Sequence, residues 1–281
     1  MGPPLQSGRT ERLPYSLSRW TDVPGAKWGW FQEALRQREM IAIDPRTGVP
    51  GRWSLAPEET LGLVWWTKAP TVLADAAADL KPYDNQFHVT ITGWHEVEKG
   101  VPHWRDAAEG LVRLSKEFGK GHVIWRFSPV PVLPGGDLVT RFASIANKLK
   151  GHVGAVYLSF LQENDLMPEK RSAGDRVTVM KLLAEVAADR GIKVLLCNED
   201  RTLAGLDVHP NLAAGVCAQP EYWMLDSREK PPSEGCGCVL MADPFTINES
   251  CTFGCQYCYA ADKSLAPKKR NTTKGHLPVV P

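Results

Sequence analysis

The 281-residue chain lacks the features that would direct it to a membrane or to export. It contains no run of about 18 apolar residues, and its beginning, Met1-Gly-Pro-Pro-Leu5, lacks the apolar stretch of a signal peptide. It has no internal repeat, and its formal net charge is only +1, so no overall field draws it to nucleic acid or to lipid. We therefore expect a cytoplasmic protein with no membrane partner.

The sequence is instead rich in cysteine near its end. Six of its seven cysteines lie between Cys217 and Cys258. The total is odd, and a reducing compartment keeps thiols free, so this concentration favours a metal site over a disulfide framework.

Short runs of β-branched and aromatic residues alternate with segments of helical period. The strand-like runs are 15–18, 40–43, 61–67, 86–92, 122–127, 155–160, 193–197 and 213–217, and the helical segments are 28–38, 104–119, 137–150 and 174–190. About eight strands that alternate with helices predict an α/β fold, and at this length a complete or partial (β/α)₈ TIM-like barrel. An open doubly wound sheet is the alternative. Residues 44–51 contain turn-forming Asp, Pro and Gly and predict a hairpin-like excursion.

Composition divides the chain into four predicted parts. These are a ragged N-terminus (1–12), the α/β barrel (13–220), a cysteine-rich iron–sulfur segment that closes the C-terminal rim (221–262), and a basic tail (263–281). The tail contains Lys263, Lys268, Lys269, Arg270 and Lys274 without an acidic residue. This composition is typical of a disordered end, or of a segment that contacts nucleic acid.

The spacing Cys251-x₃-Cys255-x₂-Cys258 predicts an iron–sulfur centre. Three thiolates so close in sequence can bind three corners of a [4Fe–4S] cube, since cluster iron prefers soft sulfur ligands. One iron is left without a ligand from this loop. In radical S-adenosylmethionine (SAM) enzymes SAM binds that iron, and an electron from the cluster cleaves SAM to a 5′-deoxyadenosyl radical.

Zinc is the alternative metal for these cysteines. A zinc site could combine Cys236, Cys238, Cys255 and Cys258, although zinc sites often include histidine and none lies between 210 and 275. The cysteines outside the loop have three interpretations: an auxiliary cluster, a fourth ligand to the first cluster, or buried apolar side chains. They are Cys197, Cys217, Cys236 and Cys238.

Polar residues that end or follow predicted strands are the candidates for cofactor binding, because barrel active sites lie at that rim. They are Arg19, Asp22, Lys68, Thr92, Arg126 and Glu199. A cation among them could bind the SAM carboxylate. The alternative is an ion-pair network of Asp22 with Arg19 or Arg126 that only stabilises the rim. His88 lies inside a predicted strand and is interpreted as a core residue, and the sequence identifies no catalytic residue.

Several motifs together resemble a bacterial family labelled domain of unknown function 1848, over about residues 13–262. They are Ser18-Arg-Trp-Thr-Asp-Val-Pro24, Trp65-Trp-Thr-Lys68, Gln86-Phe-His-Val-Thr-Ile-Thr92, Val123-Ile-Trp-Arg-Phe-Ser-Pro129, Ser159-Phe160, Cys197-Asn-Glu199, Cys236-Gly-Cys238 and the Cys251–Cys258 loop continuing to Ala260. This family is related to radical SAM proteins and is similar in cysteine spacing to spore photoproduct lyase. The resemblance implies a barrel with its cluster motif at the C-terminal end, and it implies no known reaction. Ser128 and Ala218 depart from the family pattern, which has acidic residues there.

Two hypotheses of different classes follow. The first is a radical SAM-type enzyme that acts on a nucleobase or nucleic acid and takes electrons from a donor such as a flavodoxin or ferredoxin. The second is a non-catalytic iron–sulfur or zinc-stabilised binding protein.

Overall fold

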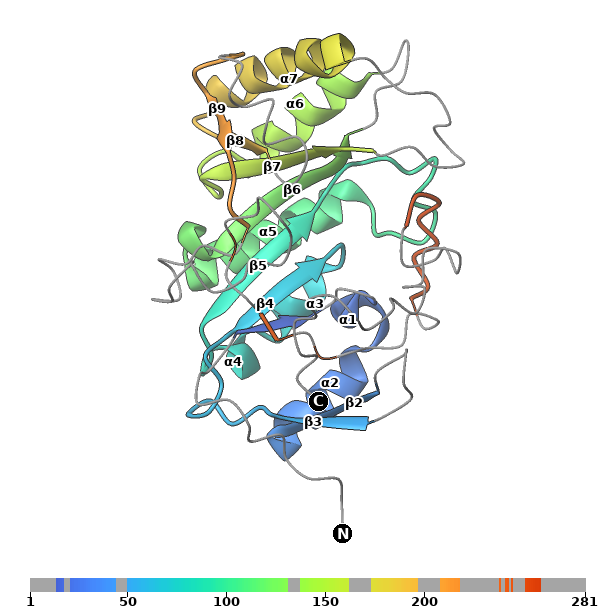
Figure 1. The fold of residues 1–281 in the computed structure, drawn as a ribbon, viewed down its shortest axis with the longest axis vertical. Coiled ribbons are helices and arrows are strands. Elements are labelled where there is room, and N and C mark those ends of the chain that lie inside the picture. Colours follow the sequence, from blue (N-terminus) through green and yellow to red (C-terminus); the bar gives the residue numbers. More distant parts are fainter. Residues whose placement is uncertain are drawn as a thin grey trace, which may run out of the picture.

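A computed structural model describes residues 14–17, 21–43, 50–130, 137–161, 173–196, 208–217, 238, 241–242, 244 and 251–258. Seven strands in this part of the chain form one parallel sheet, and their order in the sheet is their order in the chain (Figure 1). The strands are β1 (Tyr15–Leu17), β4 (Leu63–Thr67), β5 (Asn85–Thr90), β6 (Val123–Val130), β7 (Ala155–Phe160), β8 (Lys193–Leu196) and β9 (Leu212–Ala214). The predicted parallel α/β fold is therefore confirmed.

One predicted strand lies outside this sheet. Strand β2 (Glu39–Ile43) pairs antiparallel with β3 (Pro50–Ser54), with Ile43 opposite Pro50. The predicted excursion is thus a hairpin, and the expectation that run 40–43 joins the parallel sheet was wrong. The physical reason is a local partner: only six residues separate β2 from β3, a connection that allows antiparallel pairing and is too short for a parallel crossover, so β2 pairs with β3 instead of with the sheet.

The four predicted helices are present close to their expected limits. They are α2 (Trp28–Gln37), α5 (Trp104–Phe118), α6 (Leu138–Leu149) and α7 (Ala173–Ala188). Sequence patterns did not reveal the short helices α1 (Val23–Ala26), α3 (Pro70–Asp75), α4 (Ala77–Leu80) and the 3₁₀ turn η1 (Lys120–His122). Each of these spans two turns or fewer, which is too short for a helical period to show. No helix in the described ranges is both long and apolar enough to cross a lipid bilayer.

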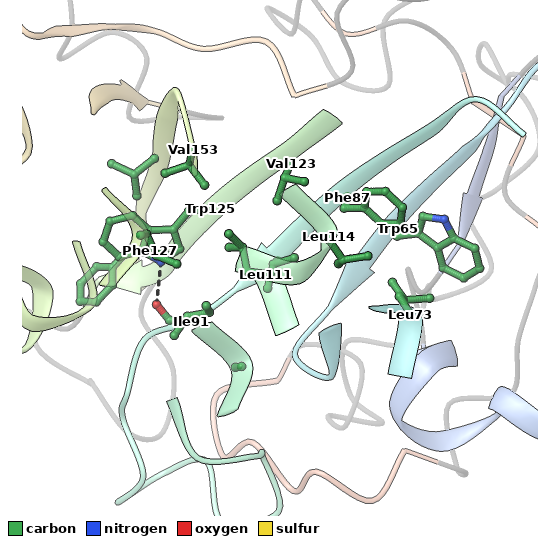
Figure 2. Packing of buried hydrophobic residues seen from close by; sticks show 14 of the residues in the cluster. Trp65, Leu73, Phe87, Ile91, Leu111, Leu114, Val123, Trp125, Phe127 and Val153 are labelled. Carbon is green, nitrogen blue, oxygen red and sulfur yellow. Dashed lines mark hydrogen bonds between the residues drawn. The ribbon is translucent and has the colours of Figure 1, made fainter. Parts of the chain in front are cut away.

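The main hydrophobic core lies between the sheet and a row of helices. Helix α3 packs against α5, α5 against α6, and α6 against α7, so these helices cover one face of the sheet, which we call the helix-covered face. Trp65, Phe87, Trp125 and Phe127 point into this layer and are fully buried (Figure 2). The Trp125 ring stacks on Phe142, 4.9 Å between centroids, and its Nε1 donates a hydrogen bond of 3.0 Å to the Ile91 carbonyl.

The opposite face of the sheet, which we call the second face, has a different character. Because successive strand residues point to opposite sides, Trp66, His88, Arg126 and Tyr157 lie on this face. C-terminal residues pack on it, namely Cys217, Cys238 and Met241.

The C-terminal segment also reaches the edge strand β1. Ala242 forms a parallel bridge with Tyr15, in which the Ser16 amide donates to the Ala242 carbonyl at 2.7 Å and the Ala242 amide to the Pro14 carbonyl at 3.0 Å. The first strand of the sheet and the C-terminal segment are therefore joined by backbone hydrogen bonds.

Candidate functional site

The three-cysteine loop, residues 251–258, lies beside the carboxyl ends of β4 and β5. In Figure 1 it is the red segment on the side towards which the strand arrows point. The turn that follows β5 holds it through an antiparallel bridge between Glu98 and Cys255. On either side of this bridge the Gly100 amide donates to the Phe253 carbonyl at 2.9 Å, and the Gln256 amide to the Val97 carbonyl at 3.0 Å.

Glycines allow the loop to pack this closely. We call the region that it packs against, formed by Gly25, Gly100 and the polar residues described next, the seat of the loop. A Cβ on Gly100 would stand 2.5 Å from the Thr252 carbonyl oxygen, and one on Gly25 would stand 2.2 Å from Cζ of Phe253, which is buried beside α1. Gly254 has φ = +57°, in the left-handed region where glycine is favoured, between the first and second cysteines. The loop therefore turns tightly, and it contacts the backbone at two glycines, Gly25 and Gly100, where any side chain would collide with it.

A buried polar network ties the loop to the sheet. Nζ of Lys68 donates to Oε1 of Glu98 at 2.7 Å and to the Tyr257 hydroxyl at 3.0 Å, and that hydroxyl donates to the same carboxylate. Oγ1 of Thr92 donates to Oε2 of Glu98 at 2.7 Å. The Glu98 side chain is 2% exposed and that of Lys68 15% exposed, so the ion pair is nearly dry. Burial and the adjacent Glu98 charge raise the pKa of Tyr257, which keeps its hydroxyl a donor.

The Asp22 carboxylate holds the backbone of Lys68, which belongs to this network, in place. Its carboxylate accepts hydrogen bonds from the amide of Lys68 (2.7 Å), the hydroxyl of Thr67 (2.8 Å) and the amide of Gly25 (3.0 Å). Burial raises the pKa of Asp22, and these hydrogen bonds oppose that shift. Asp22 thus joins the end of β4, at Thr67 and Lys68, to α1.

The three thiols of the loop lie together. Cys255 is buried, Cys251 and Cys258 are partly exposed, and all three pack with Phe253 and Tyr257. Burial raises the pKa of Cys255 to about 12, the Lys68 charge opposes the shift, and the two other thiols add to it. A metal would reverse this balance, because a coordinating thiol is deprotonated outright.

The donor set can be compared with the needs of zinc and of a cluster. No group of three Cys, His, Asp or Glu side chains in the described part of the chain is arranged to hold a single metal ion. The ligands of a [4Fe–4S] cube each bind a different iron, so a cube does not require its thiols to meet at one point as a zinc ion does. The cysteines of the predicted zinc site do not all lie together. Cys238 packs on the second face and not with Cys255 and Cys258.

The predicted cofactor-binding residues fall into three groups. Lys68, Thr92 and Asp22 are brought together at the seat of the loop. Arg126 lies on the second face, where its Nη1 donates to Sγ of Cys217 at 3.3 Å. The other two, Arg19 and Glu199, lie outside the described residues, and so do Cys197 and Cys236 of the predicted metal ligands.

Sequence reasoning missed Glu98, the centre of the polar network. Glu98 and Glu96 both follow β5, yet Glu98 is buried whereas Glu96 is 65% exposed and pairs with Arg141. Position after a strand was the only signal, and it does not separate the two carboxylates.

The fold and the site define a class: α/β proteins whose parallel sheet carries a three-cysteine loop at its carboxyl edge. A family model described as Domain of unknown function (DUF1848) matches residues 15–260, and the chain belongs to this family. No curated protein is significantly similar to the chain. The family indicated by the sequence motifs is therefore confirmed, and its description assigns no reaction.

Proposed function

We propose that the chain binds a [4Fe–4S] cluster through Cys251, Cys255 and Cys258 and acts as a radical SAM-type enzyme. The observation that carries this proposal is the seat of the loop. Three soft donors are gathered at the carboxyl edge of a parallel sheet, where α/β enzymes place their active sites. Three thiols from one loop leave a corner of the cube for a small molecule.

We also propose that the sheet is part of a barrel. The strands follow one another in chain order, α3, α5, α6 and α7 cover one face, and Ala242 pairs in parallel beyond the edge strand β1. A barrel has all its helices outside, and its inner face would then be the second face.

When bound, the cluster would supply the low-potential electron that cleaves SAM. The chain's own residues prepare the site for it. Lys68 places a positive charge beside the thiols, where it offsets their negative charge once they are ionised. Tyr257 stacks on Trp94, 5.7 Å between centroids, and together with Phe253 it shields the loop from water.

Glu98, Thr92 and Asp22 already have hydrogen-bond partners within the protein, so we assign them to holding Lys68 and Tyr257 in place. Arg19 and Glu199 are proposed contacts for SAM or substrate, and Arg126, which donates to Cys217, is proposed to contact them from the second face. A nucleobase or nucleic-acid substrate, a flavodoxin or ferredoxin as electron donor, and nucleic-acid contact through the basic tail remain proposals that rest on sequence.

Anaerobic reconstitution with iron and sulfide tests the proposed function. We expect the wild-type protein to gain the absorbance of a cluster, and Cys251→Ala, Cys255→Ala and Cys258→Ala to lose the signal of this site. Thr252→Ala is the matched control, because it changes an exposed, non-thiol side chain of the same loop and should keep the cluster.

SAM then separates an enzyme from a binding module. We expect SAM to change the electron paramagnetic resonance spectrum of the reduced cluster and 5′-deoxyadenosine to appear. A spectrum that SAM leaves unchanged, without 5′-deoxyadenosine, would leave a non-catalytic iron–sulfur protein. Colourless protein that contains zinc would reject both the cluster and the radical chemistry.

A further inference from the structure

Two cysteines far apart in the sequence meet on the second face of the sheet. Cys217 and Cys238 are separated by 21 positions, and both belong to the apolar cluster that packs there as free thiols. The backbone amide of Cys217 donates a hydrogen bond of 3.2 Å to Sγ of Cys238. Because that nitrogen and the Cβ of Cys217 are bonded to the same Cα, rotation about the Cα–Cβ bond of Cys217 carries its thiol towards the Cys238 sulfur.

The surroundings of this pair suit a bond between the two sulfurs. Each cysteine is only 5% exposed and is packed among apolar side chains. No three Cys, His, Asp or Glu side chains in the described part of the chain are placed to hold a metal ion. A disulfide needs neither a third ligand nor a cavity, since it replaces two S–H groups by one S–S bond of about 2.05 Å.

Arg126 prepares Cys217 for this chemistry. Its Nη1 donates to Sγ of Cys217 at 3.3 Å, and its guanidinium lies over the rings of Trp66 and Tyr157, 5.3 and 5.8 Å from their centroids. A guanidinium beside a sulfur stabilises the thiolate, which is the form of cysteine that attacks an oxidant. His88 hydrogen-bonds the Cys217 backbone but stays neutral, because burial lowers its pKa to about 3. Arg126, and not His88, therefore supplies positive charge to the sulfur.

We propose that Cys217 and Cys238 are a redox-active pair that a hydroperoxide converts to a disulfide. The Cys217 thiolate attacks the O–O bond, which forms a sulfenic acid and releases an alkoxide that takes up a proton. The Cys238 thiol then attacks this sulfur, the S–S bond forms, and the hydroxyl leaves as water with the Cys238 proton. Two electrons pass from the sulfurs to the peroxide, and a thiol reductant reverses the reaction.

The disulfide fastens the C-terminal segment to the sheet. Cys217 follows β9 and Cys238 precedes Ala242, which pairs with β1, and these two strands are the edges of the sheet. The segment after β9 is already held on the second face, since the Tyr157 hydroxyl donates to the Val216 carbonyl at 2.7 Å. A cross-link over 21 positions restricts the unfolded chain, so oxidation should stabilise the fold.

The loop cysteines take no part in this pair, because they pack in a separate cluster. The inference therefore does not rest on the proposed function, and it is tested on iron-free protein. The triple variant Cys251→Ala/Cys255→Ala/Cys258→Ala is reduced, exposed to an equimolar amount of hydrogen peroxide and alkylated. We expect mass spectrometry of the digest to find the Cys217 and Cys238 peptides joined, and dithiothreitol to separate them. The wild-type chain should give the same cross-link, and the oxidised protein should unfold at a higher urea concentration than the reduced protein.

Three variants separate the roles of the residues. Cys238→Ser should stop the reaction at a sulfenic acid on Cys217, which dimedone traps. Arg126→Gln should slow the oxidation several-fold, and Arg126→Lys, which keeps the charge, should recover part of the rate. Circular dichroism establishes that each variant is folded.

A folded chain whose Cys217 and Cys238 both remain open to alkylation after peroxide treatment would overturn the proposal. A cross-link of either cysteine to Cys197 or Cys236 would do the same. So would a disulfide that forms equally fast in urea-unfolded chain, because the fold would then not bring the pair together.

Discussion

The helix-covered face of the sheet and the seat of the cysteine loop are stabilised in different ways. On the helix-covered face large apolar rings such as Trp125, Phe127 and Phe142 pack against one another in a dry layer. At the seat an ion pair and two glycine backbones contact the loop, and the loop's own Tyr257 hydroxyl joins the ion pair. The first region provides most of the folding free energy, which scales with apolar burial. The second region positions the three thiols. There the exact position of each contact matters more than the amount of apolar area that is buried.

Trp125→Ala should give the largest loss of stability and should leave the loop intact. The change removes a fully buried ring and its hydrogen bond to Ile91, so we expect a loss of about 3–5 kcal/mol in the free energy of unfolding. Urea unfolding measures it. The iron content of the loop site, per folded chain, should stay at the wild-type value.

Trp66→Ala is the control from the second face. Trp66 is only partly buried, so its removal should cost about 1–2 kcal/mol. Equal losses for the two tryptophans would contradict the division between the faces.

Glu98→Gln should have a smaller effect on stability and a larger one on metal retention. The amide keeps the shape of the carboxylate but leaves the Lys68 ammonium without its counter-charge in a nearly dry site, and we expect a loss of about 2–3 kcal/mol. Because Tyr257 loses its charged acceptor, the loop should release iron faster to a chelator.

Glu96→Gln is the matched control, since Glu96 is exposed and its pairing with Arg141 should contribute less than about 1 kcal/mol. Equal iron-release rates for the two variants would show that the network does not hold the loop.

The same contrast explains what the sequence could predict. The rings of the helix-covered face recur at strand and helix periods, so the strands from 61 onwards and helices α2, α5, α6 and α7 were found from local patterns. The cysteine spacing is also local. The partnership of Glu98 with Tyr257 joins positions 159 apart and follows no period, so only the folded chain shows it. Strand β2 was assigned to the wrong sheet for a related reason, because strand propensity does not specify a partner.

Gly25→Ala should have the smallest effect on stability. Whether the variant is more or less stable than the wild type shows whether Phe253 packs on α1. In an ordinary helix a glycine-to-alanine change stabilises by about 0.5–1 kcal/mol, and Gly29→Ala in α2, which has no atom within 4 Å of the new Cβ, should show that gain. At Gly25 the Cβ would stand 2.2 Å from Phe253, so we expect a loss of about 1–2 kcal/mol from overpacking. The variant should also retain iron less well, because Phe253 belongs to the loop. Adding Phe253→Leu should recover part of the loss, and urea unfolding of the single and double variants measures this coupling. A stabilising Gly25→Ala would mean that Phe253 does not rest on α1. The loop would then be held by its polar network alone, and the bare backbone of Gly25 would have no part in seating it.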